Sequence, residues 1–204
     1  MALTRRNFLL FAANDAHVYE GPGKRAMSEV GAPEDASSEK AVAPVPVGTR
    51  SVRDFLRRCV GCLKCVDACP RGLLRPSSRL DRLGRPEIVF RLGWCRPECS
   101  RCAAACPAGA LGDPNATAEG KKTSRAGLAR WIPERCVAAT GKDVCHACER
   151  HCPTQAITLA RNPKAGEDAP PVPSVDAAKC IGCGACEYYC PARPKTAMIV
   201  EGRN

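Results

Sequence analysis

The sequence predicts an α+β fold in which two small, loop-rich units follow one another. Three observations support this prediction. The 204 residues contain sixteen cysteines in four groups of four. They also contain 17 glycines and 18 prolines but only two Trp, three Tyr and four Phe, so the side chains supply too little apolar surface for a conventional core. Short helix-like and strand-like stretches alternate with the cysteine groups in a repeat of about 40 residues.

Each cysteine group ends in the pattern Cys-x2-Cys-x3-Cys-Pro, and only the first gap varies. The groups are Cys59, Cys62, Cys65 and Cys69; Cys95, Cys99, Cys102 and Cys106; Cys136, Cys145, Cys148 and Cys152; and Cys180, Cys183, Cys186 and Cys190. This is the bacterial run that binds [4Fe–4S] clusters, in which the fourth cysteine serves a second cluster. The sequence therefore predicts four [4Fe–4S] clusters, held by these sixteen cysteines, as the core of the fold.

Three other interpretations of the cysteines fit less well. Zinc sites place two Cys-x2-Cys pairs a dozen or more residues apart. A disulfide framework suits the cysteine content, but thiols this crowded have poor geometry for bridges. The spacing Cys95-x3-Cys99-x2-Cys102 resembles radical S-adenosylmethionine enzymes, which leave one iron open, whereas here Cys106 completes a set of four.

The formal charge of +10 is the kind of excess that accompanies nucleic-acid binding. Each [4Fe–4S] core with four thiolates carries about −2, so four clusters bring the total to about +2. The basic residues therefore balance buried negative charge, and nucleic-acid binding is not expected. The sequence also has no nucleophile–base pair, phosphate loop or nucleotide fingerprint, so we expect no catalytic residues.

Arginines are concentrated from the end of the first cysteine group into the second group. They are Arg71, Arg75, Arg79, Arg82, Arg85, Arg91, Arg96 and Arg101. Two interpretations remain open: a solvated surface that compensates cluster charge, or a docking face for an acidic redox partner. For the second, charge reversal at Arg79 and Arg82 is expected to slow reduction at low salt.

The first fifty residues divide into two predicted segments. Residues 1–13 contain Thr4-Arg-Arg-Asn-Phe-Leu9, which resembles a twin-arginine export signal with a short apolar region. Residues 14–50 are predicted to be an extended or disordered linker, with Pro44-Val-Pro46 wrapping the domain. No stretch is long enough to cross a membrane as a helix.

The remaining chain is predicted to form two units, residues 51–130 and 131–204. In the first, Val52–Arg58 forms a helix and Glu87–Phe90 the central strand. In the second, strand-like Trp131-Ile132 precedes Cys136, Ala156–Leu159 pairs with Pro173–Val175 as a hairpin, and Thr196–Val200 closes the sheet. His146 and His151 are expected to face solvent or form hydrogen bonds, and Trp94 to shield a cluster from water.

Two ways of sharing the fourth cysteines stay open. In neighbour pairing, Cys106 joins the first group and Cys69 the second, while Cys190 joins the third and Cys152 the fourth. In nested pairing, the first group exchanges with the fourth and the second with the third. The set of sixteen cysteines is the same in both.

The chain resembles the ferredoxin-type polyferredoxins of periplasmic nitrate reductase and methylamine utilisation systems. The resemblance rests on the four cysteine groups, the long gap from Cys136 to Cys145, and the stretch Cys180–Pro194. It implies tandem bacterial two-[4Fe–4S] ferredoxin-like folds on an exported chain. It further implies electron transfer from a membrane quinol-oxidising partner to a periplasmic reductase.

We therefore expect a non-catalytic electron-transfer protein that relays single electrons between a membrane quinol- or quinone-linked partner and a redox enzyme. Its partners would be a membrane-bound polyferredoxin or quinol oxidase and a terminal reductase. The periplasmic face of the inner membrane is favoured, with a membrane-associated cytoplasmic location as the alternative. The alternative function is an electron-input iron–sulfur subunit of a larger cytoplasmic oxidoreductase complex. A cluster-sensing or assembly role would need a labile cluster, which four complete groups disfavour.

Overall fold

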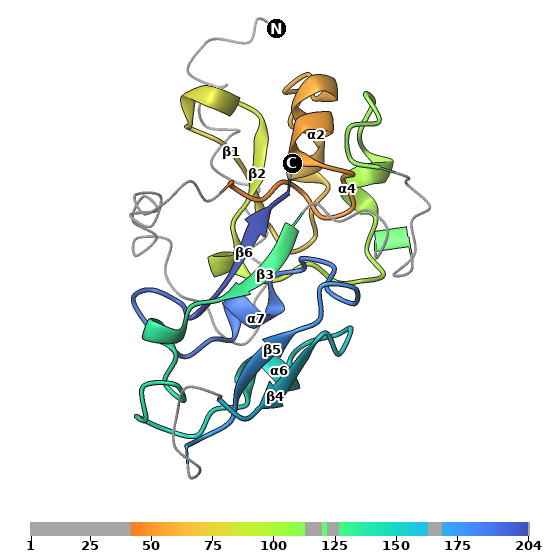
Figure 1. Cartoon of the computed structure of the whole chain (residues 1–204). Helices are drawn as coiled ribbons and strands as arrows, with labels where there is room; N and C mark the ends of the chain where they lie inside the picture. The colour runs from red at the N-terminus through yellow and green to blue at the C-terminus, as the bar shows by residue number, and fades with distance from the viewer. Residues whose placement is uncertain (1–41, 113–119, 122–126, 163–168, 204) are drawn as a thin grey trace, which may run out of the picture. The chain divides into compact units, whose positions relative to one another are not determined.

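The structure is a computed structural model that describes residues 42–112, 120–121, 127–162 and 169–203 (Figure 1). The signal-like residues 1–13 and residues 14–41 of the linker lie outside the described residues.

Each cysteine group folds into a loop that leads into a one-turn helix. The helices are α3 (Lys64–Asp67), α4 (Arg101–Ala104), α6 (Ala147–Arg150) and α7 (Ala185–Tyr188). In each group the third cysteine is the second residue of the helix, and the fourth follows the residue that caps its C-terminus. Leu63 and Gly184 enter their helices in the left-handed region, with φ of 59° and 79°. The repeat in the sequence is therefore a repeat of local structure.

Within the described residues, six short strands form three antiparallel pairs. The strands are β1 (Leu74–Pro76), β2 (Pro86–Ile88), β3 (Gly127–Trp131), β4 (Ile157–Ala160), β5 (Val172–Val175) and β6 (Met198–Gly202). β1 pairs with β2, β4 with β5, and β3 with β6. Ile157 lies opposite Val175, which confirms the predicted hairpin. β6 pairs with β3 instead of extending that hairpin, so this half has two separate sheets where the sequence predicts one.

The described residues also contain three short 3-10 helices: η3 (Leu80–Arg82), η4 (Phe90–Leu92) and η5 (Pro133–Arg135). The strand predicted over Glu87–Phe90 is shorter in the structure, because β2 ends at Ile88 and Phe90 begins η4. This turn directs Phe90 into the buried core.

Helix α2 spans Val52–Arg58, as the sequence predicts. The Ser51 side chain accepts a hydrogen bond from the backbone N–H of Asp54 (3.1 Å), the usual contact of an N-cap. Val52 and Phe55 are buried, so one face of the helix packs on the core and directs the chain into Cys59.

Residues 42–49 form a strap that packs onto the rest of the described chain, as predicted for Pro44–Pro46. Val45 and Thr49 are buried. The strap also contacts the last strand, because Gly202 N donates to Val42 O (2.7 Å). Immediately after the strap, Val52 N donates to Arg203 O (2.8 Å).

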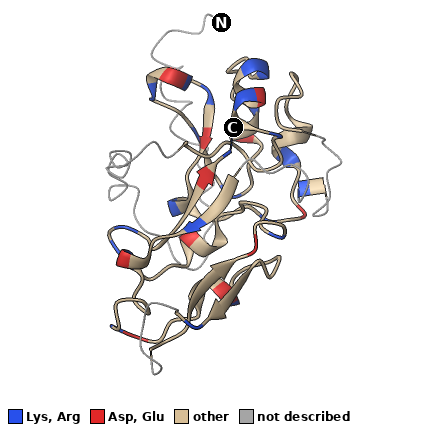
Figure 2. Ribbon diagram, viewed as in Figure 1, with Lys and Arg blue, Asp and Glu red and all other residues tan. Residues whose placement is uncertain are grey.

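The buried core runs through both halves and contains few large side chains. One cluster of buried residues includes Val45 from the strap, Phe55 from α2 and Val200 from β6, together with several cysteines. Charged residues are spread over helices, turns and strands along the ribbon (Figure 2). Within the part of the chain that the structure describes, no helix is both long and apolar enough to cross a membrane.

Candidate metal centres

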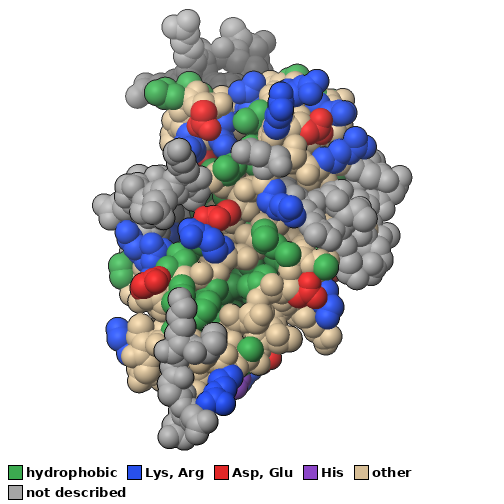
Figure 3. All heavy atoms as spheres, viewed as in Figure 1, with side chains coloured by type: hydrophobic (Ala, Val, Ile, Leu, Met, Phe, Trp, Pro, Cys, Tyr) green, Lys and Arg blue, Asp and Glu red, His purple; other side chains and the backbone are tan. Residues whose placement is uncertain are grey.

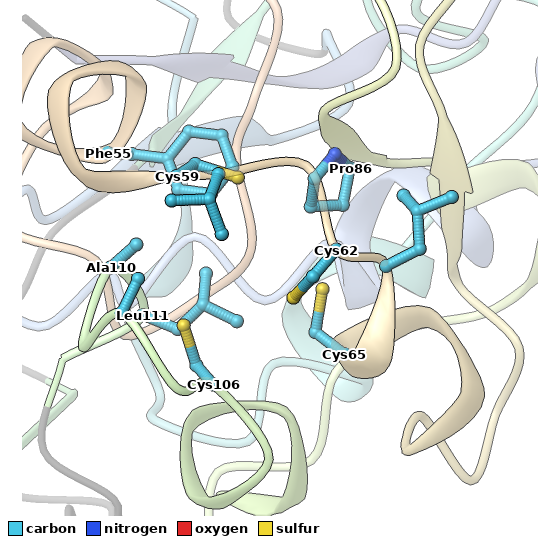
Figure 4. Close-up of a pocket in the computed structure, with 11 residues that line it drawn as sticks. Phe55, Cys59, Cys62, Cys65, Pro86, Cys106, Ala110 and Leu111 are labelled. Carbon is cyan, nitrogen blue, oxygen red and sulfur yellow. The ribbon is translucent and has the colours of Figure 1, made fainter.

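The first set of thiols comes from both of the first two cysteine groups. Cys59, Cys62, Cys65 and Cys106 line one cavity, and Figure 4 shows their sulfur atoms directed into the same space. Its apolar walls are formed by Phe55, Leu63, Pro86, Ala110 and Leu111, among others. We name this set quartet A. Its fourth thiol belongs to the second group.

The second set consists of the other four cysteines of the first two groups. Cys69, Cys95, Cys99 and Cys102 line another cavity, with Pro46 and Val47 of the strap and Leu73, Leu74 and Ile88 among its walls. We name this set quartet B. The two groups have therefore exchanged their fourth cysteines.

The second half repeats the exchange. Cys136 and Cys190 share a small buried cluster against which Cys145 packs, and Cys136 and Cys145 are the thiols that act electrostatically on Cys148. We name these four quartet D. Cys152 and Cys180 act electrostatically on Cys183, as does Cys95 of quartet B across the joint. Cys183 and Cys180 act most strongly on Cys186 among the thiols, and we name Cys152, Cys180, Cys183 and Cys186 quartet C. The structure thus groups the thiols by neighbour pairing.

The two halves meet between quartets B and C. Cys95 N donates a hydrogen bond to Cys183 O (2.9 Å), and Trp94 and Cys95 pack against Ile181 and Cys183. Close by, a Cβ on Gly184 would lie 1.9 Å from Cδ1 of Phe90. Only glycine fits at this position, so α7 and η4 approach each other at the joint between the halves.

Burial keeps several of the thiols protonated when no metal is bound. Burial raises the pKa of Cys65 to about 11 and those of Cys102, Cys148 and Cys183 to about 12. In metal-free protein these thiols stay neutral at pH 7, whereas bound metal removes their protons. All sixteen cysteines are among the described residues, and each is a free thiol.

The geometry fits a group larger than one ion. Within the described residues, no three His, Cys, Asp or Glu side chains converge closely enough to hold a single metal ion; four thiols instead surround each mapped cavity. Backbone N–H groups donate to the sulfur atoms of three fourth cysteines: Leu73 N to Cys69 (3.5 Å), Ala156 N to Cys152 (3.2 Å) and Ala197 N to Cys190 (3.3 Å). Four soft thiolate donors, apolar walls and N–H···S contacts are what a [4Fe–4S] cluster requires.

Other residues singled out in the sequence have structural contacts. His146 lies 3.8 Å from Glu149 on the surface, and the His151 ring stacks on Tyr189 at 3.7 Å. Trp94 packs against Cys95 and Ile181, and the Arg71 guanidinium lies 5.0 Å from its ring centre. Trp94 thus lies beside a thiol of quartet B, and its role as a shield of the cluster stays a prediction.

The predicted arginine face needs one correction. Arg82 is only 3% exposed, and its guanidinium donates to Ala43 O (3.1 Å) and pairs with Asp81 (3.3 Å). It holds the strap and is not part of a docking surface, so charge reversal there would disturb the fold. Arg79 is exposed and pairs with Asp81 (3.2 Å).

Sequence reasoning missed one residue at quartet B. Lys121 is buried, and its ammonium group lies 3.8 Å from Cys95 Sγ. It also donates to Arg96 O (2.7 Å) and Cys99 O (2.5 Å). No spacing rule distinguishes Lys121 from the adjacent Lys122 in this polar stretch, so only the structure identifies it.

Comparison with known proteins agrees with the site. Residues 58–110 and 143–193 each match the 4Fe-4S dicluster domain family. The chain is 34% identical over 197 residues to the ferredoxin-type protein NapG of Haemophilus influenzae, covering 91% of this chain and 67% of that protein. It is 37% identical to NapG of Escherichia coli over 153 residues, covering 71% and 64%. It is also 37% identical over 166 residues to the methylamine utilization ferredoxin-type protein MauM of Methylorubrum extorquens, covering 77% and 72%.

The chain therefore spans about two thirds of the length of these relatives. Among solved structures, a chain of a formate dehydrogenase–heterodisulfide reductase–formylmethanofuran dehydrogenase complex from Methanospirillum hungatei is similar to this protein. The match covers 80% of this chain and 54% of that chain. It has 20% identity and a TM-score of 0.28, too low to establish a shared overall fold. Two dicluster domains account for four [4Fe–4S] clusters. The chain belongs to the ferredoxin-type iron–sulfur proteins of the NapG and MauM kind, built from tandem 4Fe-4S dicluster domains.

Proposed function

We propose that the sixteen cysteines of quartets A to D ligate four [4Fe–4S] clusters, and that the chain relays single electrons along them without catalysing a reaction of its own. The observation that best supports this proposal is that the four quartets are neighbours in the order A, B, C and D. Helices α3 and α4 each lead to a thiol of the other's quartet, as do α6 and α7, and the Cys95–Cys183 hydrogen bond joins the halves. When bound, each cluster accepts or gives up one electron.

The two ends of this order are the places where partners reach the wire. Val60 lies between Cys59 and Cys62 of quartet A and is 72% exposed. Val144 precedes Cys145 of quartet D and is 60% exposed. Small apolar contacts of this kind suit the brief, limited interfaces of electron-transfer encounters. The chain therefore offers one docking loop at each end.

Basic side chains lie near the quartet A end. Arg53, Arg57 and Arg58 are exposed on α2, and Lys and Arg side chains gather at this end of the face in Figure 3. They favour an acidic partner, whose approach they would steer. We place a membrane quinol- or quinone-linked partner and a terminal redox enzyme at opposite ends of the wire. The signal-like residues Thr4–Leu9 support the periplasmic face of the inner membrane.

The first test is anaerobic purification with iron and acid-labile sulfide analysis. Four cubanes give roughly 16 iron and 16 sulfide per chain, and dithionite reduction gives EPR spectra broadened by coupling between neighbouring clusters. About half that iron, or zinc in its place, would refute the four-cluster relay. Stable co-purification with a flavin, molybdenum or nickel subunit would instead identify an electron-input subunit of a larger complex.

The second test separates a wire from a store of independent clusters. Cys99→Ser removes a ligand of quartet B, in the interior of the order, and Cys62→Ser removes one of quartet A, at an end. With a donor that reduces the chain through the Val144 loop and an acceptor that docks at Val60, both variants should stop transfer to the acceptor. Cys62→Ser should still allow reduction of the cluster at quartet B, whereas undiminished transfer in Cys99→Ser would contradict the wire.

A further inference from the structure

Lys121 places a positive charge beside one of the four clusters. Its side chain is 2% exposed. The ammonium group lies 3.8 Å from the sulfur of Cys95 and donates to the backbone carbonyls of Arg96 and Cys99. These carbonyls belong to the loop that presents Cys95 and Cys99 to quartet B, so the charge is fixed in the wall of that site.

A buried charge acts strongly on a neighbouring redox centre. Reduction adds one negative charge to the cluster and its thiolates, and a positive charge in contact with a ligand sulfur favours the reduced form. Burial limits the screening that weakens the same charge in water.

The other side of the joint has the opposite charge. In quartet C, Glu187 directly follows Cys186 in helix α7. A Glu187 oxygen also accepts a hydrogen bond from Val200 N (2.8 Å), which fixes the carboxylate near the site. Lysines next to other quartets are exposed: Lys64 beside Cys65, and Lys179 beside Cys180, which lies 3.7 Å from Asp176.

We propose that Lys121 raises the reduction potential of the cluster in quartet B above that of quartet C, so that an electron crossing the joint rests at quartet B. This inference depends on the four-cluster relay proposed above. In the step itself, one electron leaves the reduced site at quartet C and enters the oxidised site at quartet B. No bond is made or broken and no proton moves. Lys121 acts on the cluster through its positive charge and does not ligate it.

The test is an anaerobic potentiometric titration of the full holoprotein with dithionite, monitored by EPR. Lys121→Gln removes the charge and keeps a hydrogen-bond donor, whereas Lys121→Arg keeps both. Lys64→Gln is the matched control, because it makes the same change at an exposed lysine beside a ligand. In Lys121→Gln we expect the reduced-to-oxidised ratio of one cluster at fixed potential to fall about tenfold, equivalent to ~59 mV for a one-electron couple. Lys121→Arg and Lys64→Gln should match the unmodified chain.

Glu187→Gln provides a second measurement of opposite sign. It keeps an acceptor for Val200 N and removes the negative charge, so a different cluster should become easier to reduce. Unchanged potentials in fully loaded Lys121→Gln would overturn the proposal. So would loss of about four iron in both Lys121 variants, which would show that the lysine only closes the loop. An unmodified chain without four reducible clusters would instead refute the relay itself.

Discussion

The two halves of the molecule share one cysteine repeat but complete their folds with different scaffolds. The second half contains two strand pairs, and Cys180, Cys183 and Cys186 of quartet C are all buried. Within residues 42–112, the first half has the single pair β1–β2. It is completed by α2 and the strap, both of which bond to the end of β6 or the residue after it. Cys62 of quartet A remains exposed.

This difference shows that one cysteine spacing can lead to thiol sets of different burial. Burial depends on the scaffold around each loop. Three of the four thiols are buried in each of quartets C and D, whereas all four in quartet B are half-buried and Cys62 of quartet A is exposed. Burial therefore differs between the halves and does not follow the A–B–C–D order. The first half also depends on residues from the other end of the chain.

Removal of the clusters should have the largest effect. Without iron, the buried thiols must be accommodated as neutral groups in a core with few large side chains, so we expect both halves to unfold. Quartet A should release iron to a chelator before quartet C, because Cys62 is exposed. Chelator absorbance and circular dichroism would follow the two events. A cooperative melt of cluster-free protein would contradict this expectation.

Gly184→Ala should break the joint between the halves. The new Cβ would lie 1.9 Å from Phe90 Cδ1 at a residue with φ of 79°, and the combined overpacking and backbone strain should cost about 3 kcal/mol or more. Gly141→Ala is the control, since its φ is 68° but nothing lies within 4 Å of a Cβ there. It should cost about 1 kcal/mol. Equal thermal stability of the two variants would mean that the joint is loose.

Arg82→Gln should destabilise the first half more than the second. It removes a buried charged donor from Ala43 O, and the loss should be about 2 kcal/mol. Arg79→Gln alters an exposed arginine paired with the same Asp81, so its effect should stay within about 0.5 kcal/mol. Iron release from quartet B, whose walls include Pro46 and Val47 of the strap, measures the difference between the variants. If Arg79→Gln had the larger effect, the strap would not be what secures this half.

Substitutions at the two exposed valines should have the smallest effect on stability but separate the roles of the two ends. Val60→Lys should slow electron exchange with one partner several-fold, and Val144→Lys with the other, while iron content stays unchanged. Stopped-flow kinetics at varied salt would measure both rates. Leu80→Lys changes another exposed residue, one that lines neither mapped cavity, and should leave both rates unaltered. If both valine variants slowed electron exchange with the same partner, the proposal that the two partners dock at opposite ends would be wrong.

Local patterns predicted the parts of the fold that depend on local chemistry. The spacing of the cysteine groups, the α2 helix and the β4–β5 hairpin are of this kind, because each depends on neighbouring residues. Contacts between residues far apart in the sequence could not be predicted from local patterns. Nothing near Arg82 indicates that it is buried under the strap, 39 residues from its acceptor Ala43. Lys121 meets quartet B 26 residues from Cys95. The separation of β6 from the hairpin likewise depends on β3, which lies about 70 residues earlier.

The hydrogen bonds from Gly202 to Val42 and from Val52 to Arg203 also affect how the protein is made. A ribosome produces residues 42–112 first, and this part contains all eight cysteines of quartets A and B. The contacts that seat its strap and α2 form only after residues 202–203 have been synthesised. The first half therefore gains the last contacts of its fold only when the end of β6 has been made. We expect quartets A and B to become fully enclosed at that point and not before.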